Sequence, residues 1–208
     1  MRTIRNAFLL ILLIAAGTLF TLRVTGLEPR YIDPGSPAFV QSGRTAWPGL
    51  WLPGEVVREP VHDWDWVYEV DHPVRGNTIM LETRTWYGVP HSVTINATAR
   101  GEELYIGGSE QDFRLEKEFP ESKAWWANIE RDPRVRLKID GRIYEMTAVL
   151  VADRAKVAEL IGRNPVTTVT GPDGTEQVTG VRHYWRLFQR NIPEYGDGSP
   201  TGSSGESD

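Results

Sequence analysis

The clearest helical pattern of apolar positions begins near residue 122. Ser122 can cap a helix in which Trp125, Trp126 and Ile129 recur at three- and four-residue spacing, the arrangement that turns one aromatic-rich face inward. Asp132-Pro133 then ends the helix, because proline disfavours the helical conformation of the residue before it. The pattern predicts a short helix that ends at this proline.

A two-residue period follows at once, in residues 134–139, where apolar and basic side chains alternate as in a half-buried strand. Asp140-Gly141 favours a two-residue hairpin loop, since both central positions of that turn adopt positive φ. Residues 143–151 are the returning strand. The helix is therefore predicted to lead directly into a β-hairpin.

Three further strands are predicted upstream. Residues 79–86 and 89–100 are joined by a short Tyr87-Gly88 turn, and residues 103–106 return after the next turn. With the hairpin, these consecutive antiparallel strands and the intervening helix predict a barrel or a strongly bent sheet.

Both flanks of this region carry weaker patterns. Between residues 61 and 73, aromatic and apolar residues at every second position are typical of one face of a strand, and the His and Asp residues among them match no metal-ligand spacing. Asp153 is expected to cap a short helix that ends at Asn164-Pro165. Residues 182–190 form a last element, either helix or strand.

The N-terminal segment, residues 7–22, is uncharged and is flanked by Arg2, Arg5 and Arg23. It is slightly shorter than the ~20 residues of a usual span, which Val24 can extend. Apolar residues continue past the small ones, which favours an uncut anchor over a cleaved signal peptide or a buried core helix. The positive charges before it favour a domain on the outer, periplasmic side.

The composition of the chain excludes several classes of function. The formal net charge of −5 argues against nucleic acid as a partner. The absence of cysteine excludes disulfides, thiolate metal sites and thiol catalysis. The chain also has no phosphate-loop, dinucleotide-fingerprint, nucleophile-elbow or His-Glu-x-x-His motif. No catalytic side chain and no metal site are predicted.

Residues 78–162 resemble the split β-barrel flavin- and deazaflavin-binding oxidoreductases, which include pyridoxamine-phosphate oxidase-like proteins and deazaflavin-dependent nitroreductases. The resemblance is most specific from Trp125-x-x-Asn128 through Asp132-Pro133-Arg134-Val135, followed by Gly141-Arg142-x-Tyr144-x-x-x-Ala148. It implies a mainly β, Greek-key-like split barrel, FMN or a deazaflavin coenzyme, hydride transfer to or from a small organic substrate or quinone, and a homodimer.

The resemblance also implies which residues bind the cofactor. They lie on the second strand and its neighbours and around the start of the helix. The cofactor-binding residues expected by position are Arg84, Thr85, His91, Ser92, Thr94, Ser109, Lys123, Trp125 and Asn128.

The predicted organisation has four parts. Residues 1–24 are the membrane anchor, residues 25–60 a Pro/Gly-rich linker, residues 61–195 the cofactor-binding split barrel, and residues 196–208 a disordered tail.

Two departures from the family pattern keep alternatives open. Thr85-Trp86-Tyr87-Gly88 stands where deazaflavin-using members usually have a basic turn, and residues 110–121 are acidic. The chain is alternatively a non-catalytic split-barrel module that binds a flavin, tetrapyrrole or lipid, or an interaction protein of the envelope. Trp125 and Trp126 can equally be core residues.

Overall fold

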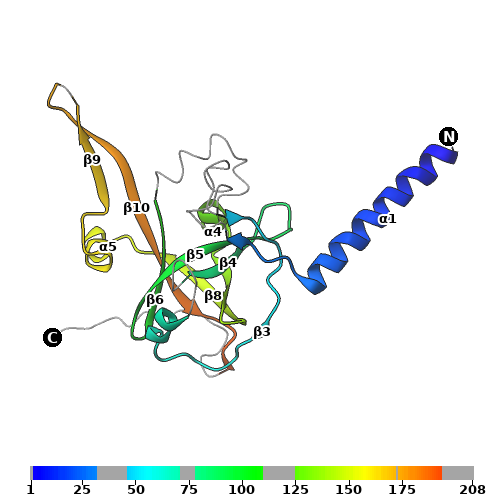
Figure 1. Ribbon diagram of the computed structural model, residues 1–208, viewed down its shortest axis with the longest axis horizontal. Helices are drawn as coiled ribbons and strands as arrows, with labels where there is room; N and C mark the ends of the chain where they lie inside the picture. The colour runs from blue at the N-terminus through cyan, green and yellow to red at the C-terminus, as the bar shows by residue number, and fades with distance from the viewer. Residues whose placement is uncertain (1, 32–45, 71–77, 110–124, 172, 194–208) are drawn as a thin grey trace.

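The computed structural model describes residues 2–31, 46–70, 78–109, 125–171 and 173–193, and shows a long N-terminal helix that projects from a β-barrel (Figure 1). The elements, in chain order, are α1 (Arg2–Thr25), β1 (Arg30–Tyr31), β2 (Ala46–Trp47), β3 (Glu55–Val56), the 3-10 helix η1 (Asp65–Glu69), β4 (Thr78–Thr83), β5 (His91–Arg100), β6 (Glu103–Ser109), α4 (Trp125–Arg131), β7 (Arg134–Ile139), β8 (Arg142–Leu150), α5 (Arg154–Ile161), β9 (Val166–Thr170) and β10 (Glu176–Gln189).

The sheet closes on itself. Its strand order is β3-β8-β7-β4-β5-β6-β10-β9, and β10 also pairs with β8, so that six strands form a closed barrel. The interior is apolar, with Leu81, Leu104 and Leu137 fully buried. The predicted fold class, a mainly β split barrel with helices and an N-terminal apolar helix, is confirmed.

Local sequence patterns correctly predict the succession of α4, β7 and β8. The loop residues Asp140 and Gly141 have φ of 48° and 76°, as the predicted two-residue hairpin requires. α5 begins where Asp153 accepts a hydrogen bond from the backbone N–H of Ala155 at 2.8 Å. Both predictions are confirmed. The predicted cap Ser122 lies outside the described residues.

The strand predicted at residues 61–73 is wrong, because this segment forms η1. The carboxylate of Asp63 accepts a hydrogen bond from the N–H of Asp65 at 2.8 Å, which turns the chain. Trp64 and Val67, three residues apart, are then both buried on one side of the 3-10 turn. Trp64 packs edge-on against Tyr144, 5.3 Å between ring centroids, so the aromatic residues serve the core.

The short Tyr87-Gly88 turn is also wrong in its extent. β4 ends at Thr83 and β5 begins at His91, which leaves a seven-residue connection, residues 84–90. The buried Thr85 hydroxyl donates to the carbonyl oxygen of Val89, and the N–H of Gly88 donates to the carbonyl oxygen of Thr85 at 3.2 Å. These local bonds replace strand pairing in the connection.

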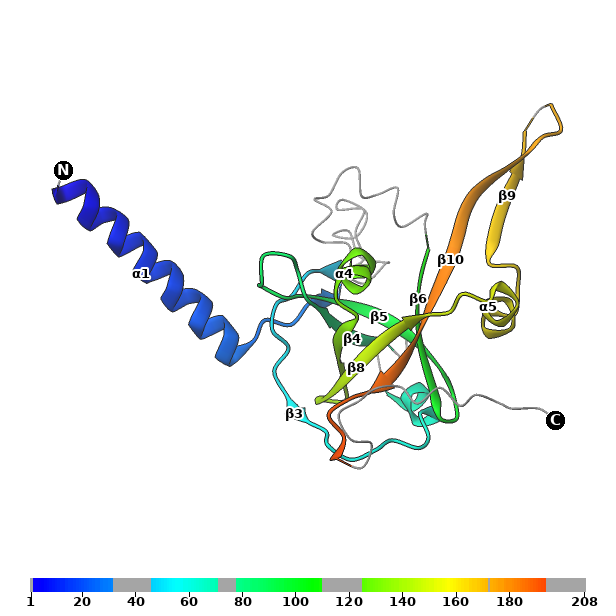
Figure 2. The same cartoon turned by 180° about the vertical axis from the view of Figure 1, so that it is seen from behind.

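The last element is a strand. β10 is 14 residues long, and its first part forms an antiparallel arm with β9, a strand that local pattern did not predict. The arm projects away from the barrel on the side opposite α1 (Figures 1 and 2).

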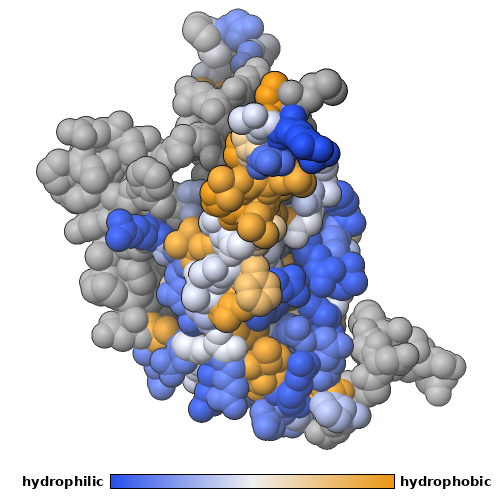
Figure 3. Space-filling model, turned by 90° about the vertical axis from the view of Figure 1, so that its right-hand side faces the viewer, coloured by the Kyte–Doolittle hydropathy of each residue, from blue (hydrophilic) through white to orange (hydrophobic). Residues whose placement is uncertain are grey.

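α1 is long and apolar enough to cross a membrane, with no buried residue. Its side chains gather as a hydrophobic surface in the upper centre of the view from that side of the molecule (Figure 3). The segment after it lies on the barrel: Leu52 is buried, and Gly49 forms a β-bridge with Ser92. The four-part domain boundaries stay a prediction.

Candidate functional site

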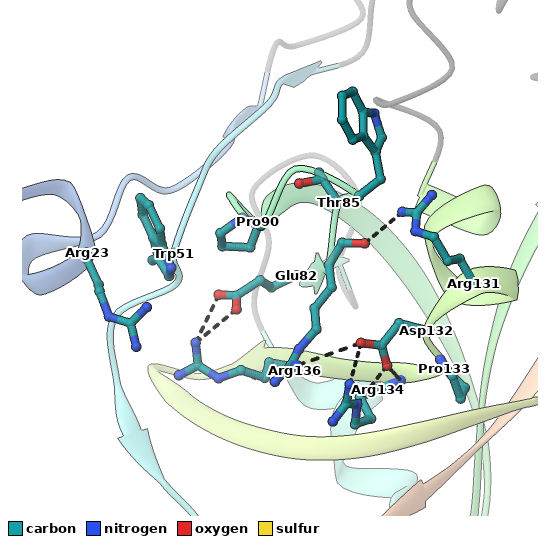
Figure 4. A pocket seen from close by; sticks show the side chains of 13 residues that line it. Arg23, Trp51, Glu82, Thr85, Pro90, Arg131, Asp132, Pro133, Arg134 and Arg136 are labelled. Atoms are coloured by element: carbon teal, nitrogen blue, oxygen red, sulfur yellow. Dashed lines mark hydrogen bonds and ion pairs between the residues drawn. The ribbon is translucent and has the colours of Figure 1, made fainter. Parts of the chain in front are cut away.

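A cavity of about 920 Å³ lies between the end of α1, the segment around Trp51, the connection after β4, and the start of β7 (Figure 4). Its lining residues come from these places, from β4 and from the end of α4, and include five arginines and two carboxylates. They are Arg23, Trp51, Glu82, Arg84, Thr85, Trp86, Gly88, Pro90, Arg131, Asp132, Pro133, Arg134 and Arg136.

The innermost charged pair joins two neighbouring strands. β4 and β7 are antiparallel with Glu82 directly opposite Arg136, and Nη1 of Arg136 donates to both Glu82 oxygens, at 3.1 and 2.9 Å. One of these oxygens also accepts the backbone N–H of Leu52 at 2.6 Å. Glu82 is only 7 % exposed, so this carboxylate ties β4, β7 and the segment after α1 together.

A second pair lies between α4 and β7. Asp132 accepts hydrogen bonds from Nε and Nη2 of Arg134 at 2.7 and 2.8 Å, and Nη1 of Arg84 approaches it at 3.7 Å. The Arg134 hydrogen bonds, together with the positive charge of Arg84, hold the pKa of Asp132 below its ordinary value. Asp132 is therefore ionised at neutral pH and balances part of the positive charge.

Arg131 is oriented without a carboxylate. Its Nη2 donates to Asn128 Oδ1 at 2.6 Å and to the Arg84 carbonyl oxygen at 3.0 Å. The buried Asn128 in turn donates to the hydroxyl of Thr83 at 3.0 Å, which fixes the direction of its amide. Among the described residues Arg131 forms no ion pair, so its charge is available to a ligand.

The lining carries an excess of three positive charges, from five arginines against two carboxylates. Arginine in a fixed orientation binds phosphate and carboxylate groups through paired hydrogen bonds. The arrangement suits a ligand that bears an anionic group.

The structure brings together only part of the predicted set. Arg84 and Thr85 line the cavity, and Asn128 lies behind it and holds Arg131. Ser92 is buried, and its hydroxyl donates to the carbonyl oxygen of Leu50 at 2.8 Å, so it fastens the segment after α1. The Nε2 atom of His91 is hydrogen-bonded to the Tyr87 hydroxyl.

Three further predicted residues, Thr94, Ser109 and Trp125, are not part of the cavity lining. Thr94 is half-buried on β5, and Ser109 ends β6 opposite Arg182. Trp125 packs on Trp185 at 5.2 Å between ring centroids, a core contact. Lys123 lies outside the described residues.

Sequence reasoning missed most of the charged lining. Arg134 and Arg136 follow the alternation of an ordinary solvated strand face, and Arg23 follows the membrane segment. The available signal was Glu82, a carboxylate inside an otherwise apolar and hydroxyl-bearing strand, which calls for a cationic partner.

Fold and cavity together define a class, a split barrel with a cationic cavity at one side. Residues 74–171 match the family model described as F420H(2)-dependent quinone reductase. This match confirms the predicted resemblance to the split-barrel flavin- and deazaflavin-binding oxidoreductases.

Solved structures that match this chain share low sequence identity with it. A candidate pyridoxamine 5′-phosphate oxidase of Listeria innocua is 17% identical, with a TM-score of 0.31, over 55% of this chain and 88% of its own. A pyridoxamine 5′-phosphate oxidase-related, FMN-binding protein of Nostoc punctiforme is 11% identical, with a TM-score of 0.30, over 60% and 73%.

A candidate 5-nitroimidazole antibiotic resistance protein of Bacteroides thetaiotaomicron is 9% identical, with a TM-score of 0.29, over 53% of this chain and 80% of its own. The comparison with curated proteins found no match.

Proposed function

We propose that this protein is a membrane-anchored oxidoreductase that uses a deazaflavin coenzyme or FMN, with its anionic group held in the arginine-lined cavity. The observation that carries the proposal is Arg131, which Asn128 and the Arg84 carbonyl orient and which forms no ion pair with a carboxylate of the described residues. Arg131 lies within residues 74–171, the part that matches the quinone reductase family model.

The residues present fit such a cofactor. The cationic wall supplies Arg84, Arg131 and Arg134 for an anionic group, and Trp51 supplies aromatic surface for a flat ring. The volume lies within the range of roughly 300–1,000 Å³ typical of small-molecule sites. When bound, the cofactor ring supplies the hydride chemistry, so the protein needs to bind and orient it and to exclude water.

The acceptor and the oligomeric state are proposed from the resemblance, and the side of the membrane from the charges that flank α1. A quinone is the first candidate acceptor, since the matching family is named for quinone reduction, and a nitro compound is the second. α1 holds the domain at a membrane, with the domain on the outer side. The active form is a homodimer, which light scattering of the purified protein tests.

Cofactor binding tests the proposal directly. The full chain, purified in detergent, is titrated separately with oxidised F420 and with FMN, and binding is followed by the change in cofactor fluorescence. We expect binding of one of them, and a loss of at least about tenfold in affinity in R131Q, because charge-assisted hydrogen bonds contribute about 1.5–3 kcal/mol.

R163Q is the matched control, since Arg163 is exposed at the end of α5 and outside the cavity. Binding of neither cofactor by wild type, or equal affinity of R131Q and R163Q, contradicts the cavity assignment. Tight binding without transfer of reducing equivalents to any quinone or nitro compound supports the non-catalytic module instead.

A further inference from the structure

The end of α1 is fastened to the barrel by backbone bonds. The N–H of Leu27 donates to the carbonyl oxygen of Trp51 at 3.1 Å, and the N–H of Leu50 donates to the carbonyl oxygen of Leu27 at 2.6 Å. Lys138 of β7 pairs with Glu28 and donates to the carbonyl oxygen of Pro53 at 2.7 Å. The helix therefore meets the barrel in a defined orientation.

Gly26 makes this close approach possible. Its φ is +72°, and a Cβ there would lie 2.5 Å from the Trp51 carbonyl oxygen. Only glycine adopts this conformation in this space without displacing backbone. The junction between α1 and the barrel is therefore tightly packed. A fixed junction determines which face of the barrel lies nearest the C-terminal end of α1.

That face carries the connection after β4. In Figures 1 and 2 the loop between β4 and β5 reaches toward the C-terminal end of α1, and Arg23 and Trp86 line the same cavity. Trp86 is 72 % exposed, more than any other large hydrophobic residue outside α1 in the described part of the chain. Tyr87 beside it is also exposed and packs edge-on against it, 5.3 Å between ring centroids.

Exposed tryptophan and tyrosine next to an arginine are typical of the interface between a membrane and water. Their amphipathic rings are favoured at the level of lipid headgroups, where the apolar body leaves water while the polar edge stays hydrated. Arg23, in the last turn of α1, forms no ion pair among the described residues, and its guanidinium suits a lipid phosphate.

We propose that the loop of residues 84–90 lies in the headgroup layer of the membrane that α1 crosses, with Trp86 and Tyr87 inserted among the lipids and Arg23 at their phosphates. The cavity mouth then faces the bilayer surface. The inference rests on the membrane anchoring in the proposed function and adds the face and the loop that touch the lipid.

The arm formed by β9 and β10 provides the internal contrast. Val178 on the arm is also exposed, but the arm projects away from α1 in both views (Figures 1 and 2). Exposure alone therefore does not select the lipid-contacting site, whereas exposure beside the fixed end of α1 does.

The absence of cysteine in the chain allows a test with single labels. W86C, V178C and L13C in the full chain are labelled with an environment-sensitive fluorophore and reconstituted in vesicles of phosphatidylcholine and phosphatidylglycerol. Nitroxide lipids with the quencher at the headgroup or deep in the acyl chain report the depth of each label.

We expect the label at residue 86 to lose most of its fluorescence to the headgroup nitroxide, the label at 13 to the acyl-chain nitroxide, and the label at 178 to neither. R23Q should weaken quenching at residue 86, whereas R163Q should not. As a second readout without a label, W86F should lower the quenching of intrinsic fluorescence by brominated lipids.

The outcomes separate the two proposals. Quenching at residue 13 with none at residue 86 overturns the loop assignment and leaves the anchor intact. No quenching at residue 13 overturns the membrane anchoring, and the loop assignment with it. Equal quenching at residues 86 and 178 also overturns the loop assignment, because the barrel then has no preferred face.

Discussion

The two carboxylate–arginine pairs of the cavity differ in what surrounds them. Glu82 and Arg136 form the inner pair, on adjacent strands, with side-chain exposures of 9% and 25%. Asp132 and Arg134 form the outer pair, two residues apart in the chain, with exposures of 18% and 52%. The inner pair joins three segments, whereas the outer pair closes a local turn.

The difference in exposure suggests different roles for the two pairs, one in the stability of the fold and one in the charge of the cavity. Removing one partner of a buried pair leaves an uncompensated charge, which is strongly destabilising, whereas exposed pairs contribute little. The inner pair should therefore hold the barrel, while the outer pair sets the electrostatics of the cavity mouth. A substitution in each pair tests this comparison, and a third, N128A, tests the residue that orients Arg131 beside them.

The largest effect is expected for E82A. This substitution leaves the Arg136 charge without its partner and removes the acceptor of the Leu52 N–H. Because Arg136 keeps some solvent, we place the loss near the lower end of the 3–5 kcal/mol range, about 3 kcal/mol. For a chain of this size that lowers the melting temperature by about 6–12 °C.

Thermal unfolding in detergent measures this loss, and E82M/R136M is the matched control. Removing both charges should restore most of the melting temperature, since well-packed apolar replacements are often neutral. An E82A melting temperature equal to that of wild type would show that the inner pair has no structural role.

An intermediate effect is expected for N128A. The substitution leaves Thr83 and Arg131 without their amide partner, a loss of about 1–3 kcal/mol in unfolding free energy. It also releases Arg131, so cofactor affinity should fall together with stability. Thermal unfolding and cofactor titration of the same sample measure both quantities.

A double-mutant cycle with T83V sharpens the result. The two substitutions break the same hydrogen bond, so the double variant should lose less stability than the sum of the single variants. Strict additivity would indicate that the Asn128 amide does not act through Thr83.

The smallest effect on stability is expected for R134Q, which should mainly change a pKa. Hydrogen bonds from Arg134 are the main cause of the lowered pKa of Asp132, so the substitution should raise that pKa toward the ordinary value of an aspartate. Carboxyl ¹³C chemical shifts followed through an acid titration measure it. An unchanged pKa would assign the shift to Arg84 instead.

The sign of the linked stability follows from the lowered pKa. A carboxyl group with a lower pKa in the folded state stabilises the protein above about pH 4, and this contribution is lost as the pH falls through the folded-state pKa. R134Q should therefore lose stability relative to wild type at neutral pH, and the difference should vanish in strong acid.

Local chemistry explains which parts of the fold were predictable. The β7–β8 hairpin carries its own turn at Asp140-Gly141, and α5 carries its own cap at Asp153. β9 lacks such a signal, and the turn at Asp63 does not by itself specify the 3-10 helix η1. β9 exists because β10 pairs with it, and η1 forms because Trp64 and Val67 need the same core. Neither requirement can be read from neighbouring residues.

The residues of the candidate site also fall into a group that the sequence predicted and a group that it did not. The resemblance located Arg84, Thr85 and Asn128, which lie in or directly behind the cavity. Arg136 and Trp51 reach it only because β4 lies beside β7 and because Glu82 holds the segment after α1. A cavity assembled from separate segments depends on long-range pairing, which short sequence patterns do not specify.

The double pairing of β10 has a consequence for biosynthesis. Residues 185–189 join β8, and residues 182–187 join β6, so the barrel closes only after nearly all described residues have been synthesised. Until then β6 and β8 have open edges, which are prone to pair with other chains. The nascent chain therefore passes through an aggregation-prone interval, and translation that stops before residue 182 leaves those edges open permanently.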